Sequence, residues 1–231
     1  MRAAQQATHF RCEGTLEREL RARGFQAVAG VDEVGRGALF GPVVAAAVIL
    51  SPSRPVRGLN DSKQLDPDRR ALLAQRIRER AVAWSVAAVD AATIDWINIY
   101  QASKMAMEMA VAQLNPAPDF ILIDAVPLSV RTPQRPLIKG DEQCHAIAAA
   151  SIVAKVWRDE RMKVWDQIFP QYGLASHKGY FTPEHARALE QYGPTPLHRL
   201  SFEPVRERSL FPLDFDPWAG AQLELFSGAA S

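Results

Sequence analysis

The segment VAGVDEVGRGALFGPVV, residues 28–44, constrains the fold of this chain more than any other. An apolar run ends at two adjacent acids, Asp32 and Glu33, and after three glycines a second apolar run occupies residues 42–50. Apolar, β-branched runs bounded by Gly and Pro predict two core strands joined by a short turn. Because a buried carboxylate is costly without compensation, the two acids require a partner beside the strand.

Strand and helix patterns alternate along the rest of the chain. Short apolar runs bounded by turn residues predict strands at residues 82–89 and 119–124, and a short strand that leaves at Asp141. Apolar residues at helical spacing, N-cap residues followed by proline, and glycine or proline stops predict five helices. These helices are expected at residues 13–23, 66–82, 98–114, 146–168 and 182–193.

Composition limits the class of protein. A chain of 231 residues, 48% hydrophobic, can bury a substantial core in one main domain with small appendages. The net charge of +1 means that a nucleic-acid partner would have to be bound by local basic clusters. No apolar run approaches the ~20 residues that span a bilayer, and the N-terminus lacks the apolar core of a secretory signal. We therefore expect a cytoplasmic protein with no membrane partner.

Acids follow three of the predicted strands, at their ends or just beyond. They are Asp32 with Glu33, Asp124 and Asp141. Any one of them alone would be an ordinary turn residue. Four carboxylates at one edge of a sheet would repel one another unless hard divalent cations lay among them. Two such cations, roughly 3.5–4 Å apart, can stabilise the attacking and leaving oxygens of a phosphodiester.

Adjacent strand residues point to opposite faces, so Asp32 and Glu33 can share a site only if the strand ends or bulges there.

The residues after the first acids are Gly35, Arg36 and Gly37. Glycine lets a ligand approach the backbone closely, and backbone groups can contact a sugar hydroxyl. Arginine can bind a phosphate through its planar fork of donors. A dinucleotide-binding loop would need a glycine where the chain has Phe40, and it would lead into a helix. The pattern therefore argues against a dinucleotide-binding loop and is compatible with close approach of a sugar hydroxyl to the backbone.

Six sequence blocks occur in the order found in a known family. They are GVDEVGRG, LNDSKQL, ILIDAVPL, KGDEQCHAIAAASIVAKVWRDERM, HKGYFTPEHARAL and HRLSFEPV. Together they resemble bacterial ribonuclease HII, the type 2 ribonuclease H, over residues 25–206. The resemblance implies an RNase H-like α/β fold, a mixed β-sheet flanked by helices with a C-terminal helical portion. It divides the chain into a lead-in segment (1–24), a catalytic domain (25–206) and a flexible tail (207–231).

The resemblance also implies an activity and a set of residues. The activity is hydrolysis of RNA in RNA–DNA hybrids and incision 5′ of a single ribonucleotide in duplex DNA, leaving 3′-hydroxyl and 5′-phosphate ends. Asp32, Glu33, Asp124 and Asp141 match the family's metal-binding catalytic acids, with two Mg²⁺ or Mn²⁺ ions as cofactors. The loop Gly35-Arg36-Gly37 matches the part that contacts the 2′-hydroxyl. Tyr180 matches the tyrosine that packs on the sugar after the ribonucleotide.

Further polar residues are candidate contacts with the nucleic acid. Lys63, Lys155 and Arg158 could contact phosphates, and Asn98 and Gln101 lie in a segment that lines the DNA groove in this family. For each of them, a solvated surface position is an equally good interpretation.

The tail contains QLELF, residues 222–226, which resembles the pentapeptide by which bacterial proteins dock on the sliding clamp. Leu223, Leu225 and Phe226 would fill an apolar pocket, and Gln222 would supply a polar contact. Alternatively, Leu225 and Phe226 fold back onto the core.

Two other functions remain as alternatives to the nuclease. One is a non-catalytic hybrid-binding module docked on the clamp, although pure binding would favour Lys and Arg over a cluster of acids. The other is a different nuclease of the same fold, such as a junction resolvase, which would not need the glycine loop with Tyr180. We expect a monomer, because no surplus apolar surface is evident outside the tail.

Overall fold

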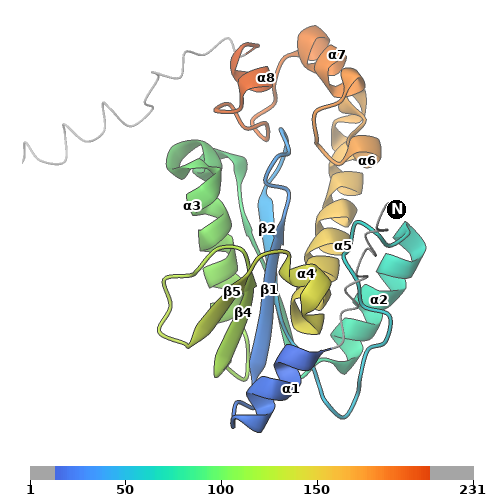
Figure 1. Cartoon of the computed structure of the whole chain (residues 1–231). Coiled ribbons are helices and arrows are strands. Elements are labelled where there is room, and N and C mark those ends of the chain that lie inside the picture. The colour runs from blue at the N-terminus through green and yellow to red at the C-terminus, as the bar shows by residue number, and fades with distance from the viewer. Residues whose placement is uncertain (1–13, 209–231) are drawn as a thin grey trace, which may run out of the picture.

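A single five-stranded mixed sheet organises the molecule (Figure 1). The structure is a computed structural model that describes residues 14–208. The spatial order is β3-β2-β1-β4-β5, with β1, β2 and β3 paired antiparallel and β1, β4 and β5 paired parallel. The strands are β1 (Val28–Val34), β2 (Val43–Ile49), β3 (Ala83–Val89), β4 (Phe120–Asp124) and β5 (Gln134–Leu137). The mixed α/β fold expected from the resemblance is confirmed.

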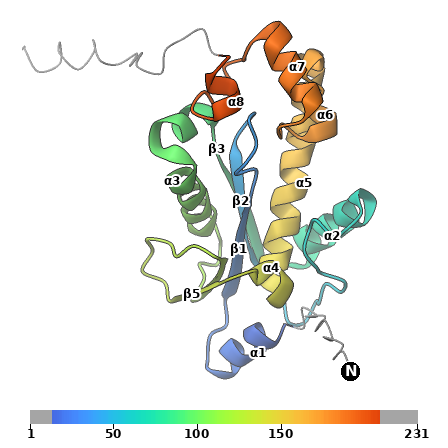
Figure 2. The ribbon, with the colours of Figure 1, turned by 45° about the horizontal axis from the view of Figure 1, so that its top comes forward.

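Helices cover both faces of the sheet, with α3 on one face and α5 with α2 on the other (Figures 1 and 2). The longer helices are α1 (Thr15–Ala22), α2 (Pro67–Arg80), α3 (Ala91–Ala112), α5 (His145–Ile168) and α7 (Pro183–Tyr192). Single turns form α4 (Gly140–Gln143), α6 (Leu174–His177) and α8 (Glu203–Arg206). As predicted, the Asp66 carboxylate caps α2 by accepting the Arg69 amide.

Small residues let α5 lie unusually close to the sheet. A Cβ atom at Gly30 of β1 would lie 2.0 Å from the backbone carbonyl carbon of Ala146, so only glycine fits under the start of α5. Ala148, Ala149 and Ala150 continue this contact and are completely buried. Asp32, two residues after Gly30 and on the same face of β1, is therefore held beneath α5.

Two element boundaries differ from those predicted. Helix α3 begins at Ala91, because the Asp90 carboxylate caps it through the Thr93 amide, and a kink at Asn98 (φ 67°) divides it. The predicted start at residue 98 was therefore only its second half. Strand β5 ends at Leu137, and Asp141 lies in the single turn α4 instead of at the end of a strand.

The C-terminal helical portion, which comprises α6, α7 and α8, lies at the same end of the molecule as the β1–β2 loop (Figure 2). The carboxylate of Asp95 on α3 accepts the amides of Leu200 and Ser201 at 2.8 and 2.9 Å, which joins this portion to the sheet layer. An isolated bridge between Phe40 and His198 makes a second connection. Within residues 14–208, every helix is too short or too polar to cross a membrane.

Candidate active site

Two of the predicted acids lie on neighbouring strands, Asp32 on β1 and Asp124 at the end of β4. The parallel pairing of β1 with β4 ends at Val31 and Ile123, so the next residues, Asp32 and Asp124, follow side by side. Alternation along β4 places Asp124 on the face of Leu122, which packs with the start of α5, and Asp32 lies on that same face. Residues 92 positions apart in the sequence thus meet at one edge.

Strand β1 neither ends nor bulges at Asp32 and Glu33, contrary to the expectation. It continues to Val34 and remains paired with β2 through Val44. Only its ladder with β4 stops, directly before Asp32. The two acids therefore lie where the ladder with β4 has ended while the ladder with β2 continues. Glu33 projects from the opposite face at the strand end, where it forms an ion pair with Arg36 at 3.3 Å.

Burial and mutual repulsion shape the electrostatics of this pair. Burial, followed by the charges of Glu33 and Asp124, raises the pKa of Asp32 well above its usual value, and a hydrogen bond from Ser151 partly offsets this. Burial also raises the pKa of Glu33; Arg36 opposes that shift, and Asp124 adds to it. The three carboxylates are thus close enough to disfavour one another's charge.

Asp141 and the loop DSKQL, residues 61–65, complete the acidic edge. Burial raises the pKa of Asp141, with further repulsion from Asp61 and Asp124 and attraction from Lys63. The hydroxyls of Ser62 and Ser151 are 2.9 Å apart, so this loop is anchored to α5 beside Asp32. Sequence analysis quoted this loop but selected only Lys63. It missed Asp61, Ser62 and Ser151, since nothing in the sequence indicates that the loop reaches α5.

Hard divalent cations match the donor chemistry of this edge. All four side chains offer carboxylate oxygens, and a cation would remove the repulsion that raises the pKa of Asp32 and Glu33. In the present rotamers these oxygens serve local partners: Asp32 accepts the Glu33 amide and Asp124 the Gly140 amide, both at 2.8 Å. Among the described residues, no three His, Cys, Asp or Glu side chains form a ready metal-binding group. The residues therefore fit a cation only after their side chains turn.

Gly35 and Gly37 are glycines for different reasons. Gly35 has φ +90°, and a Cβ there would lie 2.3 Å from Nε of Arg158, so the protein itself requires glycine. At Gly37 φ is not left-handed, and a Cβ would meet nothing within 4 Å. The backbone at Gly37 is exposed next to Arg36 and borders open space. Only Gly37 thus has the open approach that sequence analysis attributed to both glycines.

Tyr180 is half-buried and is held through its backbone by a chain of histidines. The Tyr180 carbonyl, which can only accept, lies 3.0 Å from Nδ1 of His185, so that nitrogen carries the proton. Nε2 of His185 must then accept from Nε2 of His198 at 3.1 Å, and Nδ1 of His198 accepts the Thr195 amide. Burial lowers the pKa of His185 to about 4 and of His198 to about 3, consistent with this neutral chain.

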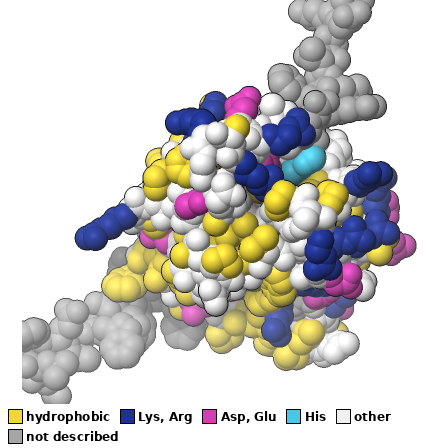
Figure 3. All heavy atoms as spheres, turned by 90° about the horizontal axis from the view of Figure 1, so that it is seen from below, with side chains coloured by type: hydrophobic (Ala, Val, Ile, Leu, Met, Phe, Trp, Pro, Cys, Tyr) yellow, Lys and Arg dark blue, Asp and Glu magenta, His cyan; other side chains and the backbone are white. Residues whose placement is uncertain are grey.

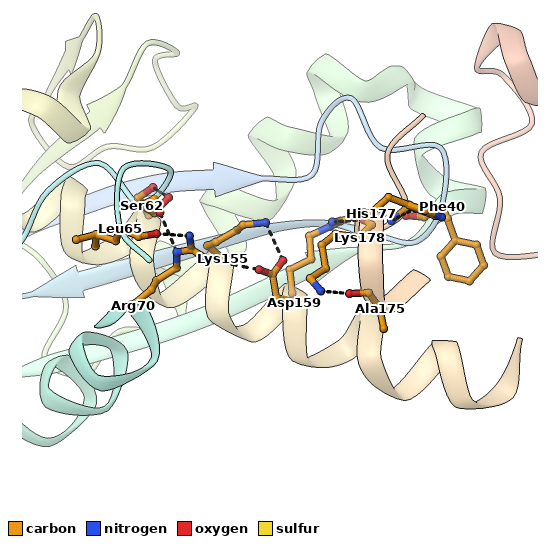
Figure 4. A network of polar contacts seen from close by, with 12 residues as sticks. Phe40, Ser62, Leu65, Arg70, Lys155, Asp159, Ala175, His177 and Lys178 are labelled. Atoms are coloured by element: carbon orange, nitrogen blue, oxygen red, sulfur yellow. Dashed lines mark hydrogen bonds and ion pairs between the residues drawn. The ribbon is translucent and has the colours of Figure 1, made fainter. Parts of the chain in front are cut away.

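Two predicted phosphate contacts are engaged inside the protein. Lys155 donates to Asp159 at 2.8 Å, and Asp159 also pairs with Arg70 from α2, as Figure 4 shows. Arg158 is completely buried, and its guanidinium donates to the backbone carbonyls of Phe40, Pro42 and Lys178. The expectation that Arg158 contacts a phosphate is therefore corrected: helical periodicity indicated its helix but not which face of that helix is covered.

The remaining predicted contacts are on the surface or outside the described residues. Lys63, Asn98 and Gln101 are exposed. The Asn98 side chain caps the second half of α3 by accepting the amides of Tyr100 and Gln101. The clamp-docking residues Gln222, Leu223, Leu225 and Phe226 lie outside residues 14–208, as does most of the predicted tail.

Figure 3 shows the face of the molecule that lies at the bottom of Figure 1, away from the acids. The described Lys and Arg side chains on this face lie mostly around its rim, interspersed with acidic and apolar ones, and form no basic cluster. Next to the acids, by contrast, Arg36 and Lys63 are both exposed. These two exposed basic side chains, beside the acids, could therefore contact a polyanion.

A mixed sheet in this strand order, with Asp32 on β1 beside Asp124 at the end of β4, is the arrangement of an RNase H-like nuclease. The family model for Ribonuclease HII matches residues 29–205. The chain belongs to the ribonuclease HII family and is an endoribonuclease, which sets aside the non-catalytic module.

Relatives and solved structures agree with this assignment. The chain is 74% identical to Ribonuclease HII of Solibacter usitatus over 231 residues, all of both chains. It is 54% identical to Ribonuclease HII of Koribacter versatilis over 196 residues, covering 85% of this chain and 77% of that one. The ribonuclease H2 of Pyrococcus horikoshii OT3 has a TM-score of 0.69 at 27% identity, covering 79% of this chain and 97% of that one. The RNase HII in a PCNA:RNase HII complex from Archaeoglobus fulgidus has a TM-score of 0.66 at 26% identity, covering 77% and 95%.

Proposed function

We propose that this endoribonuclease uses divalent cations to hydrolyse RNA in RNA–DNA hybrids and to incise 5′ of a single ribonucleotide in duplex DNA. The observation that supports this most directly is the side-by-side placement of Asp32 and Asp124, with Asp141 beside them. Residues 25–206 form the catalytic domain in this proposal, with segments 1–24 and 207–231 as appendages.

Asp32, Glu33, Asp124 and Asp141 would hold the cations. Bound there, Mg²⁺ or Mn²⁺ would supply electrostatic stabilisation of the attacking and leaving oxygens, giving 3′-hydroxyl and 5′-phosphate ends. Ser151 orients the Asp32 carboxylate by a hydrogen bond. Arg36, already paired with Glu33, is placed to exchange that partner for a phosphate.

Recognition of the sugar would use the two loops beside the acids. The open backbone at Gly37 can approach a 2′-hydroxyl closely, which is the group that distinguishes RNA from DNA. The ring of Tyr180, whose backbone is fixed by His185, would pack on the next sugar, where a deoxyribose fits. A lone ribonucleotide followed by DNA satisfies both contacts. Lys63, Asn98 and Gln101 would contact the flanking strands.

Mapping the cut position tests this proposal. Duplex DNA with one ribonucleotide, incubated with Mg²⁺ or Mn²⁺, should be nicked directly 5′ of the ribonucleotide, and EDTA should abolish the nick. All-DNA duplex of the same sequence is the control and should remain intact. Cleavage on the 3′ side, or of the all-DNA control, would contradict the proposed ribose recognition.

We also propose that the QLELF segment docks on the sliding clamp. Support comes from the spacing of Gln222, Leu223, Leu225 and Phe226 and from the clamp complex of the Archaeoglobus protein. Deleting residues 220–231 should abolish clamp binding, measured by surface plasmon resonance, while hydrolysis of free duplex stays unchanged. Ser227→Ala is the matched control and should bind normally. An unchanged clamp affinity after the deletion would refute this docking.

A further inference from the structure

Two arginines are buried beneath the proposed sugar-recognition loops. Arg158 on α5 and Arg199 after α7 are both 0% exposed. Within residues 14–208, no carboxylate forms an ion pair with either. Burial and the charge of Arg158 lower the pKa of Arg199 to about 9, which leaves Arg199 charged at neutral pH, and arginine side chains in general stay protonated in proteins. Two like charges are thus buried close together, which is costly unless hydrogen bonds compensate for the lost solvation.

Arg158 connects the two loops. We call residues 35–42 the glycine loop and residues 178–180 the tyrosine segment. Arg158 donates from Nε to the Pro42 carbonyl at 3.2 Å and from Nη2 to the Phe40 carbonyl at 3.1 Å, both in the glycine loop. Its Nη1 donates to the Lys178 carbonyl at 2.8 Å, in the tyrosine segment. Phe40 and Lys178 accordingly lie next to each other at one end of the network in Figure 4. One guanidinium therefore fixes the separation of the two loops.

Arg199 fixes the shape of the glycine loop itself. It donates from Nη1 to the Arg36 carbonyl at 2.7 Å and from Nε to the Gly41 carbonyl at 3.0 Å. Its backbone amide also donates to the Leu39 carbonyl at 2.8 Å. The Arg36 carbonyl belongs to the Gly-Arg-Gly stretch, so Arg199 holds the part of the loop proposed to contact the 2′-hydroxyl.

The backbone completes this connection. The Gly179 carbonyl accepts the amides of Leu39 and Phe40 at 2.8 and 3.3 Å. The Cζ atom of Arg158 lies 5.5 Å from the centre of the Tyr180 ring, and Nε of Arg158 occupies the space that a side chain at Gly35 would need. The glycine loop and the tyrosine segment are therefore joined directly by backbone hydrogen bonds and indirectly through the Arg158 guanidinium, so we expect them to move together.

Arginine suits this position because of its geometry. A guanidinium is planar and rigid and presents five donors in fixed directions, so carbonyls that share it are held at fixed separations. A lysine ammonium is a compact donor on a flexible stem and cannot bridge three carbonyls in that way. Hydrogen bonds from a charged donor are also about twice as strong as neutral ones, which offsets part of the burial cost.

We propose that Arg158 and Arg199 are positioning residues that set the distance between the glycine loop and Tyr180, and thereby determine how strictly the enzyme requires a ribonucleotide followed by a deoxyribonucleotide. This rests on the proposed function. A single ribonucleotide in DNA must satisfy the 2′-hydroxyl contact and the sugar contact of Tyr180 at the same time. A continuous RNA strand has no deoxyribose for Tyr180, so its cleavage depends less on the separation.

The test compares two substrates in one variant. Arg158→Lys should lower kcat/KM about tenfold more on duplex DNA with one ribonucleotide than on continuous RNA–DNA hybrid. The control is Arg161→Lys, on the same helix but exposed and stacked on Trp157, which should leave the ratio unchanged. If Arg158 had a purely structural role, the substitution would lower kcat/KM equally on both substrates, because only the fraction of folded enzyme would change. An unchanged ratio in folded Arg158→Lys would overturn the inference.

A second measurement uses the wild-type protein and is needed if Arg158→Lys does not fold. In hydrogen exchange, amides of Leu39 and Phe40 should exchange with the same opening free energy as the amide of Tyr180. Exchange rates that differ more than about tenfold after correction for intrinsic rates would show independent loops and overturn the inference. If the wild type does not cut 5′ of the ribonucleotide, the proposed function fails, whereas the exchange result still reports on the loops.

Discussion

Asp124→Asn will cleave single-ribonucleotide duplex at least about a thousandfold more slowly than the wild type while keeping its fold. In the proposed function Asp124 would help to hold the cations, so loss of its carboxylate would weaken a stabilisation of the transition state of several kcal/mol, at about 1.4 kcal/mol for each factor of ten. Asparagine retains Oδ1, so it can still accept the Gly140 amide that the carboxylate now accepts at 2.8 Å. Single-turnover cleavage and circular dichroism measure the two effects.

The matched control for this prediction is Asp68→Asn, which removes an exposed acid in the first turn of α2. It should cleave at the wild-type rate. Calorimetric titration with Mn²⁺ should show weaker binding only for Asp124→Asn. Cleavage by Asp124→Asn within tenfold of the wild type would mean that this residue is not part of the catalytic set.

Substitution of Gly35 should lower the stability of the protein, whereas substitution of Gly37 should lower its activity. Gly35→Ala combines a left-handed φ with a clash against Arg158, and should lower the free energy of unfolding by about 3 kcal/mol. Gly37→Ala has neither problem and should change stability by less than about 0.5 kcal/mol. Its methyl group fills the approach to the backbone, so cleavage at a single ribonucleotide should fall about tenfold or more. Urea unfolding and the cleavage assay measure the two quantities.

Gly24→Ala separates backbone strain from the clash. Gly24 has φ +101°, but a Cβ there would meet nothing within 4 Å. It should therefore lose only about 1 kcal/mol, the cost of the conformation alone. Equal destabilisation by Gly24→Ala and Gly35→Ala would mean that the Arg158 side chain can move away from residue 35 at little cost in free energy. Full activity of Gly37→Ala would mean that no ligand group approaches that backbone.

Local signals predicted most of the elements, because their causes are local. The cap at Asp66 and the proline after it define the start of α2, and β-branched runs define β1 and β2. The pairing of Asp32 with Asp124 was expected from the strand ends, although the reason was partly wrong, since β1 continues past the acids.

Tertiary contacts explain what the sequence could not predict. Helical periodicity predicts α5 but cannot tell that the face bearing Arg158 is covered by the glycine loop. Asp141 follows a strand in the sequence, yet its position depends on the single turn α4, which is too short to produce a periodic signal. Ser151 lies on an Ala-rich helix, and only the fold brings it to Asp32.

The contacts of Arg199 also bear on how late in synthesis the glycine loop can reach its final shape. The acids of β1 and the loop after them are made first, but the donor for the Arg36 carbonyl is encoded 163 residues later. Until that residue has left the ribosome, the nascent chain lacks the side chain that holds the Arg36 carbonyl in place. The order of the sequence thus delays the final shape of this loop until the domain is nearly complete.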